Sequence, residues 1–184
     1  MSALQFQQAL DDASLDLDRR VISDVARLLR QTQLTVSVAE SLTGGLIGSR
    51  LSQLPGSSSY FIGGVICYSP LLKVKLCSVK PATIREHGIV SEAVAREMAE
   101  GVSQLTGSRI ALSTTGIAGP NGDDISKVDV GTVFIGFLFC GDIKVKRFQF
   151  SGNRTQIRTQ TVYAALGYLR NWLTQQPAAA LLPS

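Results

Sequence analysis

The chain has 184 residues, of which 45% are hydrophobic and 17% charged, with a formal net charge of +4. This length and apolar content predict one domain with a sizeable core and exclude a wholly disordered chain. The polar, acidic N-terminus lacks the pattern of a secretory signal, and no uncharged apolar stretch reaches membrane-spanning length, so we expect a cytoplasmic protein without a membrane partner.

Cysteine and histidine usage argues against disulfides and metals. The three cysteines, Cys67, Cys77 and Cys140, form no CxxC pair. Because Cys67 and Cys140 lie in apolar runs, we expect buried thiols in a reducing compartment. The single histidine, His87, falls where an exposed helix is expected to end, which suits a structural or solvated side chain better than a catalytic base. No His/Cys cluster for zinc exists, and neither a metal nor a cofactor is expected.

Helices and strands alternate in the first half of the chain. Leu34, Val36 and Val38 alternate with polar residues as in a strand, and Ser69-Pro70 suits a capping serine followed by proline in the first helical position. After it, Leu71, Leu72 and Leu76 are expected to face the core. The predicted elements are a flexible segment over 1–16, a helix ending near Gln31, a strand over 34–39, a helix to about Leu54, a kinked strand over 60–68, a helix from Pro70 and a short helix from Pro81 to His87.

A hairpin distinguishes the second half. Ser91 suits a helix N-cap, and Gly141-Asp142 suits a hairpin turn. The predicted elements are a helix over 91–106, a strand over 109–115, a glycine-rich loop over 116–122, a surface loop over 123–129, strands over 131–139 and 143–150, a last helix over 157–172 and a flexible tail over 175–184. This order predicts an α/β fold, namely a three-layer α/β/α single domain over residues 17–174 with a mixed sheet. In such sheets ligands collect at strand ends, which directs attention to the turns that begin at Glu40, Tyr68 and Thr115.

The turn after the strand over 34–39 is the first candidate for chemistry. Ser41 follows the strand, Gly44-Gly45 follows Ser41, and a helix begins there. Amides without intrahelical partners gather at such a turn and provide donors for a negatively charged oxygen. An ordinary serine cap of a βα loop explains the same pattern.

A serine nucleophile needs a base, and a lysine can serve as one when burial or a nearby positive charge lowers its pKa. Lys73 lies between Leu71-Leu72 and Val74, which favours burial, although a surface lysine with a buried stem is the commoner case. Tyr68 ends the preceding strand, where its phenol could relay a proton or serve only as an amphipathic strand end.

Two further features suggest anion binding without establishing it. The loop from Thr115 through Gly116 to Gly122 allows close backbone approach to a ligand, but it lacks both a Walker A and a GxGxxG pattern. Arginine geometry suits a phosphate or carboxylate, and Arg154 is the candidate. The basic residues of this region lie close together, but a solvated strand edge with charged side chains explains them as well as a phosphate site does, and no nucleic-acid partner is expected. They are Lys144, Lys146, Arg147, Arg154 and Arg158.

Five blocks of the sequence, in order, resemble the CinA C-terminal domain family, which includes stand-alone nicotinamide mononucleotide deamidases. The likeness covers roughly residues 17–174. The blocks are Ala39-Glu40-Ser41-Leu42-Thr43-Gly44-Gly45, Gly64 to Lys73 with the preceding Gly56-Ser57-Ser58, Gly88-Ile89-Val90-Ser91-Glu92, Thr115-Gly116-Ile117-Ala118-Gly119-Pro120 with Val130-Gly131-Thr132, and Gly152-Asn153-Arg154.

The resemblance implies a Ser/Lys amidohydrolase that acts on a linear amide, converting nicotinamide mononucleotide and water to nicotinate mononucleotide and ammonia in pyridine nucleotide recycling. It implies Ser41 as nucleophile, Lys73 as general base and Tyr68 as its assistant. Amides around Thr43, Gly44 and Gly45 are expected to hold the oxyanion. The remaining substrate-binding residues expected are Ser57, Ser58, Thr115, Gly116 and Arg154. A small nucleotide substrate and a homo-oligomer are the expected partners.

Several positions depart from the family pattern. Leu42 replaces a frequent cysteine, Pro70-Leu71-Leu72 replaces a polar stretch, and Asn153 replaces an acidic residue. These changes leave two alternatives open: a non-catalytic competence or DNA-damage binding domain, and an amidase for another substrate. The N-terminal partner domain of longer family members is missing from the sequence, so its pyrophosphatase activity is not expected.

Overall fold

The computed structural model describes residues 19–120 and 128–175. The expected flexible segment over 1–16, residues 123–127 of the surface loop, and all of the tail except Gln175 lie outside these residues. The elements are a helix over 19–32, β1 (Val36–Glu40), α2 (Leu46–Leu51), the 3₁₀ helix η1 (Ser57–Ser59), β2 (Phe61–Ile66), α3 (Pro70–Cys77), α4 (Pro81–His87), α5 (Glu92–Thr106), β3 (Ile110–Gly116), β4 (Thr132–Phe139), β5 (Asp142–Gln149) and α6 (Arg154–Gln175).

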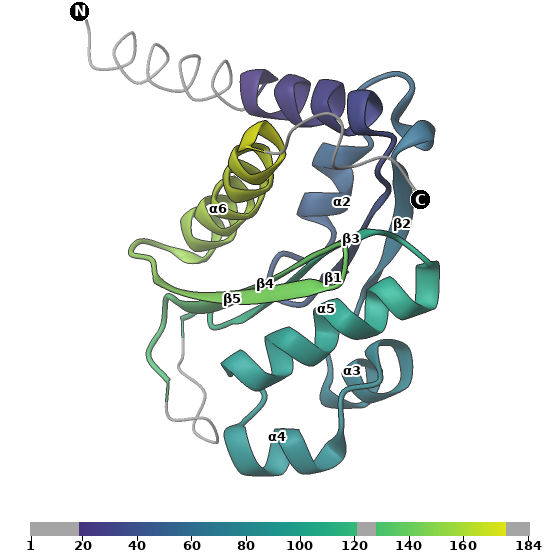
Figure 1. Cartoon of the computed structure of the whole chain (residues 1–184). Helices are drawn as coiled ribbons and strands as arrows, with labels where there is room; N and C mark the ends of the chain where they lie inside the picture. The colour runs from purple at the N-terminus through teal and green to yellow at the C-terminus, as the bar shows by residue number, and fades with distance from the viewer. Residues whose placement is uncertain (1–18, 121–127, 176–184) are drawn as a thin grey trace, which may run out of the picture.

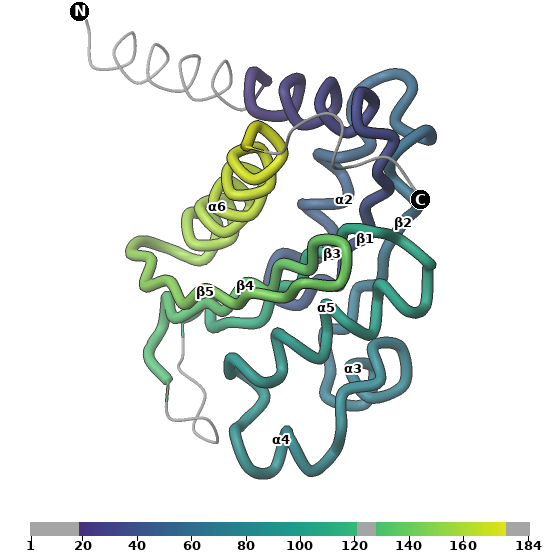
Figure 2. Tube along the Cα trace, in the orientation of Figure 1, coloured from purple at the N-terminus to yellow at the C-terminus, as the bar shows by residue number. Residues whose placement is uncertain are grey.

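A five-stranded sheet in the order β2-β1-β3-β4-β5 forms the middle layer. Strand β1 pairs parallel to both β2 and β3, whereas β4 and β5 run antiparallel as a hairpin. The helix over 19–32, α2 and α6 cover one face, and α5 with α3 and α4 covers the other (Figures 1 and 2). The α/β fold with three layers and a mixed sheet is therefore confirmed.

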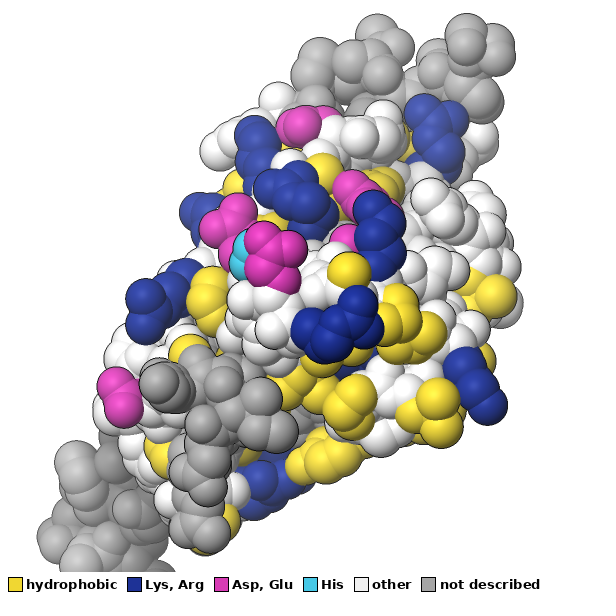
Figure 3. Space-filling view, turned by 90° about the horizontal axis from the view of Figure 1, so that it is seen from below, with side chains coloured by type: hydrophobic (Ala, Val, Ile, Leu, Met, Phe, Trp, Pro, Cys, Tyr) yellow, Lys and Arg dark blue, Asp and Glu magenta, His cyan; other side chains and the backbone are white. Residues whose placement is uncertain are grey.

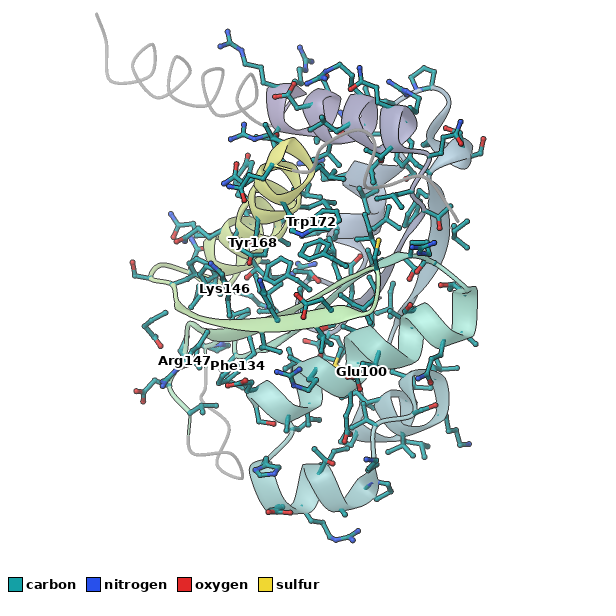
Figure 4. The ribbon with its side chains drawn as sticks, viewed as in Figure 1. Glu100, Phe134, Lys146, Arg147, Tyr168 and Trp172 are labelled. Atoms are coloured by element: carbon teal, nitrogen blue, oxygen red, sulfur yellow. The ribbon has the colours of Figure 1, made fainter. Side chains whose placement is uncertain are left out.

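The core under α6 ends in an aromatic cluster. The ring of Phe139 stacks on Trp172 with centroids 4.2 Å apart, and Phe137 lies 4.2 Å from Tyr168. Lys146 of β5 places its ammonium 4.3 Å from the Tyr168 ring centroid, on the α6 side of the sheet (Figure 4). Offset ring pairs and a cation over a ring add to the burial energy, so this cluster fixes α6 along the antiparallel half of the sheet.

The orientation of α3 differs from the sequence expectation. Ser69 caps the helix as predicted, accepting a hydrogen bond from the Leu72 amide. However, Leu71 is 59% exposed, Leu72 and Leu76 are each 36% exposed, and Lys73 is fully buried. Positions four apart share a helix face, and here that buried face is formed by Lys73 and Cys77. The expectation that the leucines face inward was wrong because α3 packs its Lys73 face toward the molecule, and Figure 3 shows hydrophobic side chains exposed on this side.

Other local expectations have mixed outcomes. Ser91 caps α5 by accepting a hydrogen bond from the Val94 amide, and Gly141 joins β4 and β5 as predicted. The prediction that Cys140 is buried was wrong, because it lies in the exposed hairpin turn with a φ of 51°. No helix in the described parts of the chain is long and apolar enough to cross a membrane.

Candidate active site

A cavity of about 290 Å³ opens at the carboxyl ends of β1, β2 and β3. This is the end at which ligands bind in open α/β sheets. Its lining comes from five separated parts of the chain, comprising Ser41, Leu42, Tyr68, Ile89, Val90, Thr115, Gly116, Ile117, Gly119 and Arg154. Five residues expected at the site, Ser41, Tyr68, Thr115, Gly116 and Arg154, are therefore brought together.

The turn that carries Ser41 is held by the residue before it. Glu40 is 1% exposed, and its carboxylate accepts hydrogen bonds from the amides of Gly45, Ile47 and Gly48 at 2.9, 3.1 and 2.8 Å. These are the amides that a helix start leaves without partners. Glu40 thus caps α2 from the end of β1 and fixes the intervening turn. Glu40 was not predicted to have a role from the sequence, although a carboxylate five residues before a glycine at a helix start is a recognisable signal.

Two amides expected to hold an oxyanion are already used. The Gly44 amide donates to the Ser41 carbonyl at 3.0 Å, and the Gly45 amide donates to Glu40. The Thr43 side chain is buried and hydrogen-bonded to the Thr114 hydroxyl at 2.9 Å. By contrast, no described residue accepts a hydrogen bond from the amides of Leu42 and Thr43. Any donors that this turn offers to a ligand are therefore these two amides rather than those of the glycines.

Lys73 reaches the same strand ends from α3. Its Nζ is fully buried and donates a 2.8 Å hydrogen bond to the Cys67 carbonyl, while the Cys67 amide donates to the Glu40 carbonyl at 2.8 Å. Two hydrogen bonds, both made by the Cys67 backbone, thus connect the amine to Glu40, the residue before Ser41. Burial lowers the pKa of Lys73, and the neighbouring Cys67 and Cys77 thiols oppose that shift in part. Lys73 does not itself line the cavity, because its side chain ends beneath the backbone that follows β2.

Tyr68 and Arg154 meet at the mouth of the cavity. The Arg154 guanidinium donates from Nη2 to the Tyr68 phenol oxygen at 2.6 Å and from Nη1 to the Gly119 carbonyl at 2.8 Å. Both side chains remain exposed, with Tyr68 at 54%. The start of α6 is therefore tied to the loops that follow β2 and β3.

The end of β3 forms the floor of the cavity. Thr115 is buried and donates from Oγ1 to the Ile89 carbonyl at 2.9 Å, which joins β3 to the segment before α5. At Gly116 a Cβ would lie 2.8 Å from the Thr132 carbonyl oxygen. Only glycine permits that approach of β4, so Gly116 shapes the floor by its missing side chain.

Two residues expected at the site lie away from the cavity. Ser57 and Ser58 belong to η1, which precedes β2 and therefore lies at the opposite end of the sheet from the cavity. A strand of this length separates them from it by roughly 20 Å at 3.3 Å per residue, and we exclude them from the site. His87 ends α4 with its side chain 48% exposed. The described residues contain no group of three or more His, Cys, Asp or Glu side chains that could hold a metal.

Comparisons with known proteins identify the family that the chain resembles. The family model described as CinA C-terminal domain matches residues 18–173. A CinA-like protein of Geobacter sp. (strain M21) is 45% identical over 157 residues, 85% of this chain and 38% of that protein. A putative competence-damage inducible protein of Clostridium novyi is 44% identical over 152 residues, 83% of this chain and 36% of that protein. The chain spans less than half the length of these curated relatives.

Solved structures of similar proteins share the fold over most of their length. The competence damage-inducible protein A of Klebsiella pneumoniae superposes with a TM-score of 0.84 and 30% identity, covering 87% of this chain and 99% of that one. The competence/damage inducible protein of Agrobacterium tumefaciens superposes with a TM-score of 0.76 and 34% identity, covering 87% and 94%.

Proposed function

The chain belongs to the CinA C-terminal domain family, and from that premise we propose that it is a Ser/Lys amidohydrolase acting on nicotinamide mononucleotide. The observation that carries the proposal is the fully buried Lys73 amine held on the Cys67 carbonyl, beside the strand end that leads into Ser41. The names of the relatives refer to competence and damage, so the proposed activity and substrate rest on this chemistry and on the family resemblance.

The first step needs a base for the Ser41 hydroxyl. A lysine serves when its pKa is lowered enough for the neutral amine to be present, and burial acts in that direction here. The Tyr68 phenol lies at the cavity and receives a hydrogen bond from Arg154, which leaves its own O–H proton available for transfer between Ser41 and Lys73. In the proposed step Ser41 attacks the carboxamide carbon while its proton passes to Lys73.

Charge then develops on the carboxamide oxygen. Preorganised amides stabilise such an oxyanion in many acyl-transfer enzymes, and we assign this role to Leu42 and Thr43. Collapse of the tetrahedral intermediate breaks the C–N bond, and protonated Lys73 returns the proton to the departing ammonia. Water, deprotonated by the same amine, then attacks the acyl-enzyme, releases nicotinate mononucleotide and restores the Ser41 hydroxyl.

The cavity offers separate regions for the two ends of such a substrate. Leu42, Ile89, Val90 and Ile117 line it with apolar side chains, which suits the aromatic ring. Arg154 uses two of its N–H groups on Tyr68 and Gly119, and its further donors suit the phosphate. We extend the proposal to a homo-oligomer that works in the cytoplasm.

The test is ammonia release from nicotinamide mononucleotide, the riboside without phosphate, nicotinamide and simple aliphatic amides. We expect the mononucleotide to be hydrolysed fastest, and Ser41→Ala and Lys73→Met to abolish release. Lys75→Met is the matched control, because Lys75 lies on the same helix but is exposed, and it should leave turnover unchanged. Full turnover by Ser41→Ala would refute the mechanism.

A non-catalytic role in DNA uptake or repair is the second candidate. The relatives' names favour it, as does the basic edge strand β5 with Lys144, Lys146 and Arg147. Against it, Arg154 and Arg158 of the same sequence cluster are engaged with the cavity and the Ser41 turn. Salt-dependent DNA binding without ammonia release from any amide in the panel would favour this candidate over the amidohydrolase.

A further inference from the structure

We infer that Arg158 is a positioning residue that holds the Ser41 turn in its reactive conformation, an inference that rests on the proposed amidohydrolase. Arg158 lies on α6, one helical turn after Arg154, and is half-buried. It neither lines the cavity nor belongs to the residues that the sequence analysis assigned to the site.

The guanidinium of Arg158 donates hydrogen bonds to the two successive carbonyls directly after Ser41. Its Nε donates to the Leu42 carbonyl and its Nη2 donates to the Thr43 carbonyl, each at 2.9 Å. These contacts join residues 116 and 115 positions apart in the chain. The planar fork of arginine matches two acceptors at once, whereas the single nitrogen of lysine does not.

Fixing the carbonyls also fixes the amides that follow them. In a planar trans peptide the carbonyl and the next N–H point in opposite directions. Arg158 therefore turns the Thr43 amide away from α6, and it turns the Gly44 amide toward the Ser41 carbonyl, where the 3.0 Å hydrogen bond is found. The Thr43 amide is one of the two that no described residue accepts, so Arg158 sets the direction of a proposed oxyanion donor.

The glycine that follows leaves room for this contact. At Gly44, with a φ of 59°, a Cβ would lie 3.3 Å from Arg158 Nη2. A side chain there would crowd the guanidinium as well as strain the backbone. Gly44 thus supports the Arg158 contact, in addition to closing the turn on Ser41.

Arg154 and Arg158 lie on the same helix but contact different parts of the site. Arg154 binds Tyr68 and the loop after β3 at the cavity mouth, whereas among the described residues the hydrogen bonds of Arg158 go to the backbone of the nucleophile turn. Removal of Arg158 is therefore expected to lower kcat without weakening substrate binding. A misplacement of about 1 Å reduces turnover by about 10²-fold in comparable cases.

The kinetic test uses Arg158→Ala, Arg158→Lys and the control Arg170→Ala, with Arg170 further along the same helix, where it donates a hydrogen bond to Asn171. We expect kcat for the mononucleotide to fall by about 10²-fold in both Arg158 variants, with KM close to that of the wild type and no change in the control. Added guanidinium should restore part of kcat in Arg158→Ala and none in Arg158→Lys. Wild-type kcat in either Arg158 variant, or a rise in KM alone, would overturn the inference.

A second measurement needs no turnover. Hydrogen–deuterium exchange of a peptide covering residues 40–46 reports on the Gly44 amide, and we expect it to speed up in Arg158→Ala while the core strand β3 exchanges as in the wild type. Unchanged exchange overturns the inference. If the wild type releases no ammonia but exchange still accelerates in Arg158→Ala, the deamidase proposal fails while Arg158 still fixes the turn.

Discussion

Lys73 and Cys67 are joined by a 2.8 Å hydrogen bond from the lysine Nζ to the backbone carbonyl. A carbonyl accepts a hydrogen bond from a neutral amine as well as from an ammonium, but it does not neutralise a charge. No described carboxylate forms an ion pair with this fully buried amine. Because an isolated buried charge is strongly disfavoured, this contact favours the uncharged base that the proposed mechanism needs.

The pH dependence of turnover and stability follows from this relationship. Burial lowers the pKa of Lys73 from its ordinary 10.5, so kcat/KM should rise with pH through that lowered pKa and reach its plateau below pH 10.5. In the window between the two pKa values the unfolded chain binds the Lys73 proton and the native chain does not. The free energy of unfolding therefore rises with pH across this window. The destabilisation caused by burying the Lys73 amine disappears fully only above pH 10.5.

Lys73→Met removes that contribution while keeping an apolar stem of similar length. Urea unfolding between pH 6 and 11 should give the wild type a steeper rise in stability than Lys73→Met. Lys75→Met should retain the wild-type slope, since Lys75 is exposed. Parallel slopes for the wild type and Lys73→Met would show that the amine is not buried in the native state.

The Arg154–Tyr68 contact is expected to couple the two side chains in catalysis. Tyr68→Phe removes the phenol that receives the 2.6 Å hydrogen bond, and Arg154→Met removes its donor. Each variant should lower kcat/KM for the mononucleotide, and the double variant should fall short of the summed losses by about 1 kcal/mol, as contacting residues do. The Arg154→Met loss should be smaller for the riboside, because that substrate has no phosphate. Full additivity would place the two residues in independent roles.

Glu40→Gln tests the cap of the nucleophile turn. One oxygen that accepts from backbone amides becomes an NH₂ group facing those donors, and a lost hydrogen bond to a buried charge costs about 3 kcal/mol. Thermal and urea unfolding should report this loss, together with reduced kcat. Glu92→Gln is the control, since its side chain is 63% exposed and surface changes stay within about 0.5 kcal/mol. Wild-type stability in Glu40→Gln would mean that the Ser41 turn does not depend on the Glu40 carboxylate.

The layer architecture was predictable because periodicity and caps act locally. The alternation of Leu34, Val36 and Val38 marks β1, and Ser69 and Ser91 begin the helices that they were expected to cap. The orientation of α3 was not predictable in this way. Three leucines on a short helix outweigh one lysine in any apolar pattern, yet the Cys67 carbonyl supplies a partner that makes burial of the lysine acceptable.

The site was predictable for residues that each belong to a recognisable local motif. Ser41, Tyr68, Thr115 and Arg154 line one cavity, as the motif order suggested. The contacts of Arg158 with Leu42 and Thr43 join distant positions, and nothing in the local sequence announces them. The prediction for Ser57 and Ser58 was wrong for a different reason. Their closeness to the motif in sequence does not show which end of the sheet their loop occupies.

Thiol reactivity tests the burial of the cysteines. Cys67 and Cys77 are buried and Cys140 is exposed, so a water-soluble disulfide reagent should label one thiol rapidly in the native protein. The other two should react only after denaturant is added, because thiols shielded from solvent are inert. Cys140→Ser should abolish the rapid phase and leave stability unchanged. Rapid labelling of Cys67 would contradict the packing of α3 around Lys73.

The packing of α3 on α5 yields a prediction with an internal control. At Gly101 of α5, a Cβ would overlap the carbonyl of Cys77, the last residue of α3, whereas at Gly167 of α6 a Cβ would meet no atom within 4 Å. Gly101→Ala should therefore lower the free energy of unfolding by at least about 3 kcal/mol through forced overpacking. It should also lower kcat, because the displaced helix carries Lys73.

Gly167→Ala makes the same chemical change in the other helix without a clash. It should raise stability by about 0.5 to 1 kcal/mol, because alanine loses less entropy than glycine in a helix. Urea unfolding and ammonia release measured on both variants give the comparison. If Gly101→Ala matched Gly167→Ala in stability and turnover, α3 would not rest against α5 at Cys77, and the position of the Lys73 amine would lose its support.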